Sequence, residues 1–375
     1  MLAMLLTLVT ALAACTPAAA PTPTPTKAPA AAPTQAAVTK PPEATKPPAQ
    51  TPTAPAAATA TPKAATIKLG TAQAVSDAAV FIAMEKGYFK EQGITLELSP
   101  LRSLNEGTAP LATGQLDAMV GSLSAGLLAA IDRGVELKIV AEKSQSIPKW
   151  EFNWVMLRKD LADSGKIKTI ADLKGMKVAI PSPGSIGEQA IQIMMEQAGL
   201  KPGDVEMVVL APADQAAAFA NQAIAAGYNF DPFIARAVQE GFAVKWVPAS
   251  TLFGGKLEAG IVVFGPALLK DQDLARRWMI PYIRGVRDYL KAFTTKEGRG
   301  DVINILVKNS TVKDPKLYDV MEMPYIDPNG QLDKKSMDAQ YKWYVEKGLY
   351  AGKKTFDDII ELSFVDYAVQ QLGKQ

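Results

Sequence analysis

Two hydrophobic patterns follow one another through most of this chain. Apolar and polar residues alternate at 66–70 and again at 94–98, which predicts strands. Between these strands, apolar residues at helical spacing follow Ser76 and Asp77 and end at Gly87, which predicts a helix with a polar N-terminus. Strand, helix and glycine then recur. We therefore expect an α/β fold in which helices cover both faces of parallel sheets.

The same patterns predict further elements to the C-terminus. The expected strands are 116–120, 135–140, 152–157, 176–180, 205–210 and 261–264, and the expected helices are 105–113, 124–133, a short one within 166–174, and 185–198. Residues 265–375 are mostly helical in pattern, with amphipathic runs near 272–293, 299–308, 333–347 and 355–372. Their apolar faces should pack on the rest of the chain.

Length and a weak internal repeat point to two lobes. About 310 residues follow the N-terminal region, which is long for a single hydrophobic core. Residues 111–140 resemble residues 219–247 in their order of helix, strand, helix and strand. Chance similarity between βα units explains this echo about equally well.

The first residues are typical of an export signal. Residues 2–14 are apolar but too few to span a bilayer, and they end in Ala13-Ala14-Cys15. This ending resembles the cleavage site of bacterial lipoproteins, in which the cysteine sulfur carries a diacylglycerol anchor. No Lys or Arg precedes the apolar run, and a plain signal that ends at a cysteine by chance is the alternative. We expect a signal over 1–15 and lipidation of Cys15, the one cysteine of the chain.

Residues 16–65 are rich in Pro, Ala and Thr and hold 13 of the 27 prolines. Such a segment has too little apolar surface to offset the entropy of ordering, so we expect a disordered tether to the membrane. The globular part would then lie on the extracytoplasmic face of the membrane.

Composition removes several functions. The net charge of +2 provides no broad basic surface for nucleic acid. The chain has no histidine, which argues against histidine-based catalysis and histidine-ligated metals. With a single cysteine there is no thiolate metal cluster. We therefore expect a protein that is not an enzyme and that holds no metal or cofactor.

Four motifs in order resemble one family. They are 79–98, 112–118, 170–179 and 230–236, and the similarity runs from about 66 to 270. The chain resembles the solute-binding proteins for aliphatic sulfonates, taurine, nitrate and the thiamine pyrimidine precursor. The resemblance implies the fold of type II periplasmic binding proteins, with two Rossmann-like α/β lobes, a ligand cleft between them, and the helical C-terminal tail packed on lobe one.

The resemblance also implies a lobe division and partners. Crossovers should fall near 155–160 and 250–260, so that lobe one comprises 66–157 and 255–375 and lobe two comprises 158–254. The chain would be a monomeric, lipid-anchored binding protein that closes on a small molecule and delivers it to the permease of an ABC importer.

Three loops supply most candidate ligand contacts. Polar residues with free helix N–H groups follow the predicted strands at the edge where the lobes should face each other. These candidates are Gln73, Ser76 and Asp77 in the first loop, Ser122, Leu123 and Ser124 in the second, and Ser182, Gly184 and Ser185 in the third. Ser76 or Asp77 can instead merely cap a helix, and Glu188 forms a capping box with Ser185 that makes an anion less welcome.

Two aromatic residues and one acid complete the candidate site. Phe230 and Asp231 stand where the family has Trp and Glu, and Trp154 could stack on a flat ligand. A core position is equally compatible with both aromatic residues. Asp231 followed by Pro232 is also a common start of a helix.

Two other functions stay open at this stage. The family fold also includes a thiamine pyrimidine synthase, but that enzyme relies on a histidine. A lipoprotein that senses a ligand would have the same cleft chemistry. Sulfonates, taurine-like amines, carboxylates and heterocycles all remain possible ligands.

Overall fold

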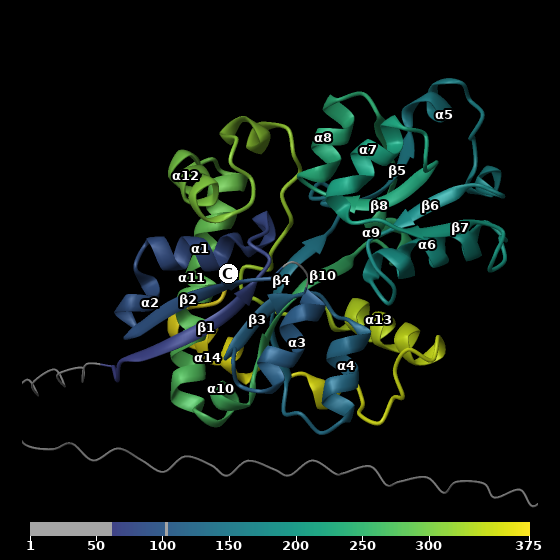
Figure 1. Ribbon diagram of the computed structural model, residues 1–375. Coiled ribbons are helices and arrows are strands. Elements are labelled where there is room, and N and C mark those ends of the chain that lie inside the picture. Colours follow the sequence, from purple (N-terminus) through teal and green to yellow (C-terminus); the bar gives the residue numbers. More distant parts are fainter. Residues whose placement is uncertain (1–61, 102–103) are drawn as a thin grey trace, which may run out of the picture. The chain divides into compact units, whose positions relative to one another are not determined.

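The computed structural model describes residues 62–101 and 104–375 (Figure 1). The predicted signal with Cys15 and nearly all of the predicted tether lie outside these residues. The described chain forms a mixed α/β fold with two five-stranded sheets. Each sheet has helices packed around it, as the alternation of patterns predicts.

The first sheet has the strand order β2-β1-β3-β10-β4. Strand β1 pairs in parallel with β2 and β3, whereas β10 runs antiparallel to β3 and β4. Its strands are β1 (Ala65–Thr71), β2 (Ile94–Pro100), β3 (Ala118–Gly121), β4 (Lys138–Ser146) and β10 (Leu257–Phe264).

The second sheet repeats this plan with the order β7-β6-β8-β5-β9. Strand β6 is parallel to β7 and β8, and β5 is antiparallel to β8 and β9. Its strands are β5 (Asn153–Arg158), β6 (Lys177–Ile180), β7 (Glu206–Val209), β8 (Ala226–Phe230) and β9 (Ala243–Pro248). The units β3–α4–β4 and β8–α8–β9 occupy equivalent places, so the sequence echo reflects a shared topology.

One strand lies in a different sheet from the one we expected. Residues 152–157 were expected at the end of lobe one, but β5 pairs with β8 and β9 of the second sheet. The chain therefore leaves the first sheet at 147–152 and returns at 249–256, before β10. The first strand after each crossing inserts antiparallel into its new sheet, so neither sheet is wholly parallel.

Fourteen α-helices are described, together with short 3-10 turns. They are α1 (Ala78–Glu85), α2 (Tyr88–Glu91), α3 (Leu104–Ala112), α4 (Ala125–Asp132), α5 (Lys159–Asp163), α6 (Ile186–Gln197), α7 (Gln215–Ala220), α8 (Phe233–Gln239), α9 (Ala249–Leu252), α10 (Pro266–Lys270), α11 (Gln272–Thr294), α12 (Arg299–Asn309), α13 (Lys334–Glu346) and α14 (Ser363–Leu372). Among the described residues, none of the helices combines the length and the apolar character that crossing a bilayer requires.

The C-terminal helices pack on the first lobe, as the resemblance implies. Helix α11 lies against α1 (Figure 1), with Gly285 at the contact. A Cβ atom at Gly285 would lie 2.1 Å from the Ala79 carbonyl oxygen, so only glycine permits this approach. Trp278, Ile283 and Tyr344 are completely buried, which confirms the apolar faces read from the sequence.

Polar contacts join the two crossing segments to each other and the tail to the second lobe. The Glu151 carboxylate accepts hydrogen bonds from the backbone N–H and the hydroxyl of Ser250, which joins the two crossings. Asp231 accepts from the Glu322 N–H at 2.8 Å, and Lys245 pairs with the Glu322 carboxylate at 2.5 Å. The tail therefore contacts both lobes.

Candidate functional site

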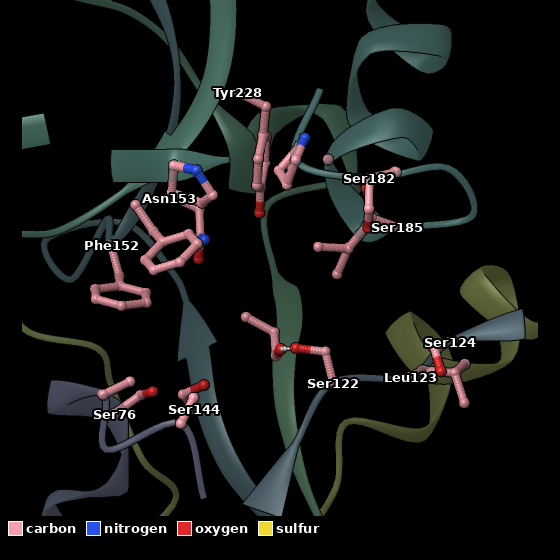
Figure 2. A pocket seen from close by; sticks show the side chains of 18 of the residues that line it. Ser76, Ser122, Leu123, Ser124, Ser144, Phe152, Asn153, Ser182, Ser185 and Tyr228 are labelled. Atoms are coloured by element: carbon pink, nitrogen blue, oxygen red, sulfur yellow. Dashed lines mark hydrogen bonds between the residues drawn. The ribbon is translucent and has the colours of Figure 1, made fainter. Parts of the chain in front are cut away.

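A cavity of about 330 Å³ is lined by residues from both lobes (Figure 2). From the first lobe come the loops after β1 and β3 together with parts of β4 and β10. From the second lobe come the loops after β6 and β7 together with the start of β5 and the end of β8. This volume is at the lower end of the range for small-molecule pockets.

Serine side chains supply much of the polar lining. Ser122 donates to the Ala259 carbonyl at 2.7 Å, and Ser124 caps α4 by accepting from the Leu127 N–H at 3.3 Å. Figure 2 shows Ser76 and Ser144 on the same side of the pocket. Among the described lining residues six are serines: Ser76, Ser122, Ser124, Ser144, Ser182 and Ser185.

The loop after β6 presents the N-terminus of α6. Ser185 donates to the Ser182 carbonyl at 2.6 Å and accepts from the Glu188 N–H at 3.2 Å. The Glu188 carboxylate accepts from the Gly184 N–H at 2.6 Å. The predicted capping box is thus shifted by one residue, because Glu188 takes the amide of Gly184 instead of that of Ser185. The positive end of this helix already holds a carboxylate.

Aromatic residues form another part of the wall. The rings of Phe152 and Phe230 lie 5.8 Å apart between centroids, tilted by 32°. Tyr228 reaches the pocket from β8, and its buried hydroxyl donates to no acceptor in the described chain, whereas the Asn153 amide lies near enough to act as a donor to its oxygen. Burial raises the pKa of Tyr228 above its ordinary value, so this group stays protonated and can donate.

An ion pair lies beside the cavity. Lys143, which lines the pocket, has its Nζ 2.6 Å from Asp77 Oδ1, and both side chains are almost completely buried. Asp77 Oδ2 accepts from the Thr71 hydroxyl at 2.5 Å and from the Ala74 N–H at 3.1 Å. The Asp77 carboxylate therefore serves Lys143 and its own loop, and it makes no side-chain capping bond to α1.

Eight of the twelve predicted site residues are among the described residues that line the cavity. They are Ser76, Ser122, Leu123, Ser124, Ser182, Gly184, Ser185 and Phe230. The structure brings these residues of three loops and one strand end together. Contact with a ligand stays a prediction for all of them.

The other four predicted residues lie elsewhere. The Gln73 carbonyl accepts from the Thr311 N–H at 2.8 Å, and Asp77 lies behind Lys143. The Trp154 indole donates to the Glu151 carbonyl at 2.8 Å, and its ring packs under Lys245. Gln73, Asp77 and Trp154 thus contact other parts of the protein and do not line the cavity.

Asp231 is also directed into the protein. Its carboxylate accepts from the N–H groups of Ala235 and Glu322, each at 2.8 Å, although Pro232 and not Asp231 is the cap residue of α8. Burial raises the pKa of Asp231 to about 6. The role of this acid in the structure is to join α8 to the tail.

The lining also includes residues that the sequence analysis missed, notably Lys143, Ser144, Phe152, Asn153 and Tyr228. All of them lie in or next to strands, whereas most of the predicted contacts lie in the loops after strands. The polar run at 142–146 was a usable signal, because buried polar residues in a strand need a reason to be there.

Comparisons with known proteins identify a family and a shared fold. The sequence pattern of the NMT1-like family matches residues 60–263, more than half of the chain. The chain belongs to the NMT1-like family. Over 81 residues it is 40% identical to a protein of Escherichia coli (strain K12) named for binding aliphatic sulfonates. The aligned segment covers 22% of this chain and 25% of that relative. The chain thus spans only a quarter of the length of that relative.

Solved structures share the fold over most of this NMT1-like chain. The periplasmic nitrate-binding protein NrtA from Synechocystis PCC 6803 has a TM-score of 0.67 at 16% identity, covering 83% of this chain and 90% of that one. The ligand-binding component of an ABC-type import system from Staphylococcus aureus has a TM-score of 0.64 at 16% identity, covering 81% and 98%.

An enzyme shares the fold as well. The desulfurization enzyme DSZB has a TM-score of 0.61 at 15% identity, covering 82% of this chain and 99% of that one. At these identities the likenesses show the fold alone, which is that of periplasmic binding proteins.

Proposed function

We propose that this chain is the extracytoplasmic solute-binding protein of an ABC importer. The observation that carries the proposal is the cavity lined by loops of both lobes, because a ligand that touches both lobes stabilises their closed arrangement. Family membership and the fold of the nitrate-binding and import-system proteins support it. A membrane permease would then be the partner that receives the small organic ligand.

In this proposal the chain binds its ligand without transforming it. Among the described lining residues, Lys143 is the one with a formal charge, and Asp77 holds that charge in an ion pair. Histidine is absent from the sequence. The pocket therefore offers no unpaired general base of the usual kinds.

The lobe division and the anchor are parts of the same proposal. The crossings at 147–152 and 249–256 would act as the hinge, with residues 16–65 as the tether and Cys15 as the lipidated residue, in a protein that works as a monomer. The apolar run before Cys15 supports the anchor. Mass spectrometry of the membrane-purified protein should show a diacylglycerol adduct that the Cys15→Ser variant lacks, and an unmodified Cys15 would remove the anchor from the proposal.

A thermal-shift screen of the full chain tests the binding function. We expect one class among sulfonates, taurine-like amines, carboxylates and heterocycles to raise the melting temperature with concentration. A ligand at 100 times its Kd stabilises a folded protein by about 2.7 kcal/mol. Phe230→Ala should weaken the shift, because Phe230 lines the pocket.

A matched control separates loss of binding from loss of packing. Phe242 is also a half-buried phenylalanine of the second lobe, but it packs in a cluster that does not line the cavity. Phe242→Ala should lower the melting temperature and leave the ligand-induced shift intact. If no compound class changes the melting temperature of the wild-type chain, the proposed function fails.

A further inference from the structure

The charge of Lys143 is cancelled within the protein. Its Nζ lies 2.6 Å from Asp77, and the side chains of Lys143 and Asp77 are 7% and 0% exposed. Asp77 cannot turn away, because the Thr71 hydroxyl and the Ala74 N–H hold its second oxygen. The pair therefore presents almost no net charge to a ligand, although a cation lines the cavity.

Side chains of the protein also take N–H groups at the helix N-termini that border the cavity. At α6 the Gly184 N–H donates to the Glu188 carboxylate, and the Glu188 N–H donates to Ser185. At α4 the Leu127 N–H donates to Ser124. Helix N-termini attract anions through free N–H groups, and here a serine takes one such group at each helix. At α6 the Glu188 carboxylate, held by the Gly184 N–H, adds a negative charge at the same end, which disfavours a second anion.

The rest of the described lining is neutral. It offers serine hydroxyls, the Asn153 amide, the Tyr228 hydroxyl, and the adjoining rings of Phe152 and Phe230. Figure 2 shows the Tyr228 hydroxyl directed into the pocket toward the side that carries Ser122. Such a lining can hydrogen-bond a polar group and contact a flat apolar face, but it does not compensate a full negative charge.

We propose that Asp77 sets the ligand class of this pocket: by neutralising Lys143 it selects an uncharged organic molecule with a flat apolar face and hydrogen-bonding groups, and it disfavours free sulfonates, carboxylates and nitrate. An anion that enters would lose its hydration without gaining an unpaired cation. Asp77 acts through Lys143 and does not itself line the cavity. This inference rests on the proposed function and gives it a substrate class.

Pairs of probes with matched shape test the inference on the full wild-type chain. Titration calorimetry compares benzenesulfonamide with benzenesulfonate and nicotinamide with nicotinate, each pair differing mainly in charge. We expect the neutral member of a pair to bind at least about tenfold more tightly, a difference of about 1.4 kcal/mol. Tighter binding of the anions, or micromolar binding of nitrate, would overturn the inference.

The Asp77→Asn variant tests whether neutralisation of Lys143 by Asp77 sets the ligand class. Removing the acid leaves Lys143 unpaired beside the cavity, so the affinity for benzenesulfonate and nitrate should rise at least about tenfold. Adding Lys143→Met should abolish that gain. Asp288→Asn is the matched control, because it removes an acid paired with Lys86 away from the cavity and should leave the anion affinities unchanged.

The remaining outcomes are also decisive. If the wild-type chain binds neither member of a pair, a gain of anion binding in Asp77→Asn supports the inference and an unchanged affinity overturns it. Melting curves check the fold, and Asp77→Ser takes the place of Asp77→Asn if the latter does not fold. Anion binding to the wild-type chain would leave the solute-binding function intact while removing this inference. Failure of every compound in both chains would remove the function as well.

Discussion

The Tyr228 hydroxyl is a buried polar group that the protein leaves unsatisfied. It lies on β8 at the pocket wall, 1% exposed, and its hydrogen has no acceptor in the described chain. Leaving a buried donor unpaired costs about 1–3 kcal/mol. A ligand atom that accepts this hydrogen bond removes the penalty, so the unpaired donor favours the bound state.

Tyr228→Phe should therefore separate affinity from stability. The substitution removes a donor that has no partner, so the free energy of unfolding should stay the same or rise slightly. Ligand affinity should fall about 5- to 30-fold, which corresponds to one hydrogen bond of about 1–2 kcal/mol. Denaturant unfolding and calorimetry with a ligand found in the thermal-shift screen measure the two quantities.

Tyr282→Phe is the control with the opposite pattern. Its buried hydroxyl donates to the Glu142 carbonyl at 2.6 Å and does not line the cavity. Losing that bond should cost about 1 kcal/mol of stability and leave affinity unchanged. Equal ligand affinity in Tyr228→Phe and the wild-type chain would show that Tyr228 does not contact the ligand.

At the scale of residues, loops were more predictable than strands. Ser124 and Ser185 could be found because each precedes a helical pattern after a strand, where a cap and a ligand site coincide. Lys143 could not be found in this way, because its effect on the pocket depends on its ion pair with Asp77, which lies 66 positions earlier in the chain. Local patterns indicate that a residue is polar, but not which distant residue neutralises it.

Among the described elements, α13 contacts one cavity loop of each lobe. The Tyr344 hydroxyl lies 3.1 Å from the Leu123 carbonyl and 2.9 Å from the Gly184 carbonyl, which belong to different lobes. A hydroxyl has one hydrogen and donates to one of these carbonyls at a time. Lys347, at the end of the same helix, pairs with Glu196 of α6 at 3.0 Å. These contacts favour an arrangement with the lobes close together.

Tyr344→Phe should loosen that arrangement without removing a pocket contact. We expect ligand affinity to fall several-fold, through faster dissociation, because the closed arrangement loses a bond that spans the lobes. Stopped-flow dissociation rates provide the measurement.

Tyr341→Phe controls for the loss of a hydroxyl on the same helix. The Tyr341 hydroxyl bonds to the Lys354 carbonyl within the C-terminal tail. This variant should dissociate ligand at the wild-type rate. If Tyr344→Phe also keeps the wild-type rate, α13 does not hold the lobes.

The boundaries of elements show where local pattern loses its power. The predicted strand 135–140 is in fact β4 at 138–146, because buried Glu142, Ser144 and Ser146 continue the ladder with β10. Polar residues at 142–146 resemble a loop until their partners are known. The placement of β5 in the second sheet was missed for a related reason, since strand pairing is decided by distant segments.

For the whole molecule, buried acids couple stability to pH. Burial raises the pKa values of Glu142 and Glu258 well above the ordinary value, and that of Asp231 to about 6. The folded chain therefore keeps protons that the unfolded chain has released. The unfolded state binds fewer protons in this window, so these groups make stability fall as pH rises, from about 4 to 6 in the case of Asp231.

Asp231→Asn should remove that part of the pH profile. Between pH 4 and 7, wild-type stability relative to the variant should fall by roughly 2–3 kcal/mol, since one pKa unit corresponds to about 1.4 kcal/mol. The variant also loses one backbone acceptor, which lowers its stability at every pH and leaves the slope unaffected. Urea unfolding at four pH values measures the difference.

An acid of the opposite kind provides the comparison. Hydrogen bonds from the Thr169 and Lys168 N–H groups lower the pKa of Asp172. The Asp172 carboxylate stabilises the folded chain above its ordinary pKa, and this stabilisation disappears as pH falls. The difference in free energy of unfolding between the wild-type chain and Asp172→Asn should therefore become smaller at low pH. Parallel profiles for Asp231→Asn and the wild-type chain would mean that Asp231 does not titrate in this window.

The serines around the cavity affect how many different ligands the pocket can accept. Ser122 and Ser185 give their hydrogens to backbone carbonyls. A hydroxyl without such a bond turns about its C–O bond and either gives or takes a hydrogen, so the other lining serines can suit ligands whose polar atoms are exchanged. A guanidinium in the same place only donates hydrogen bonds and a carboxylate only accepts them, so either group would restrict the ligand to one kind of polar atom. We therefore expect the pocket to bind several related ligands with similar affinity.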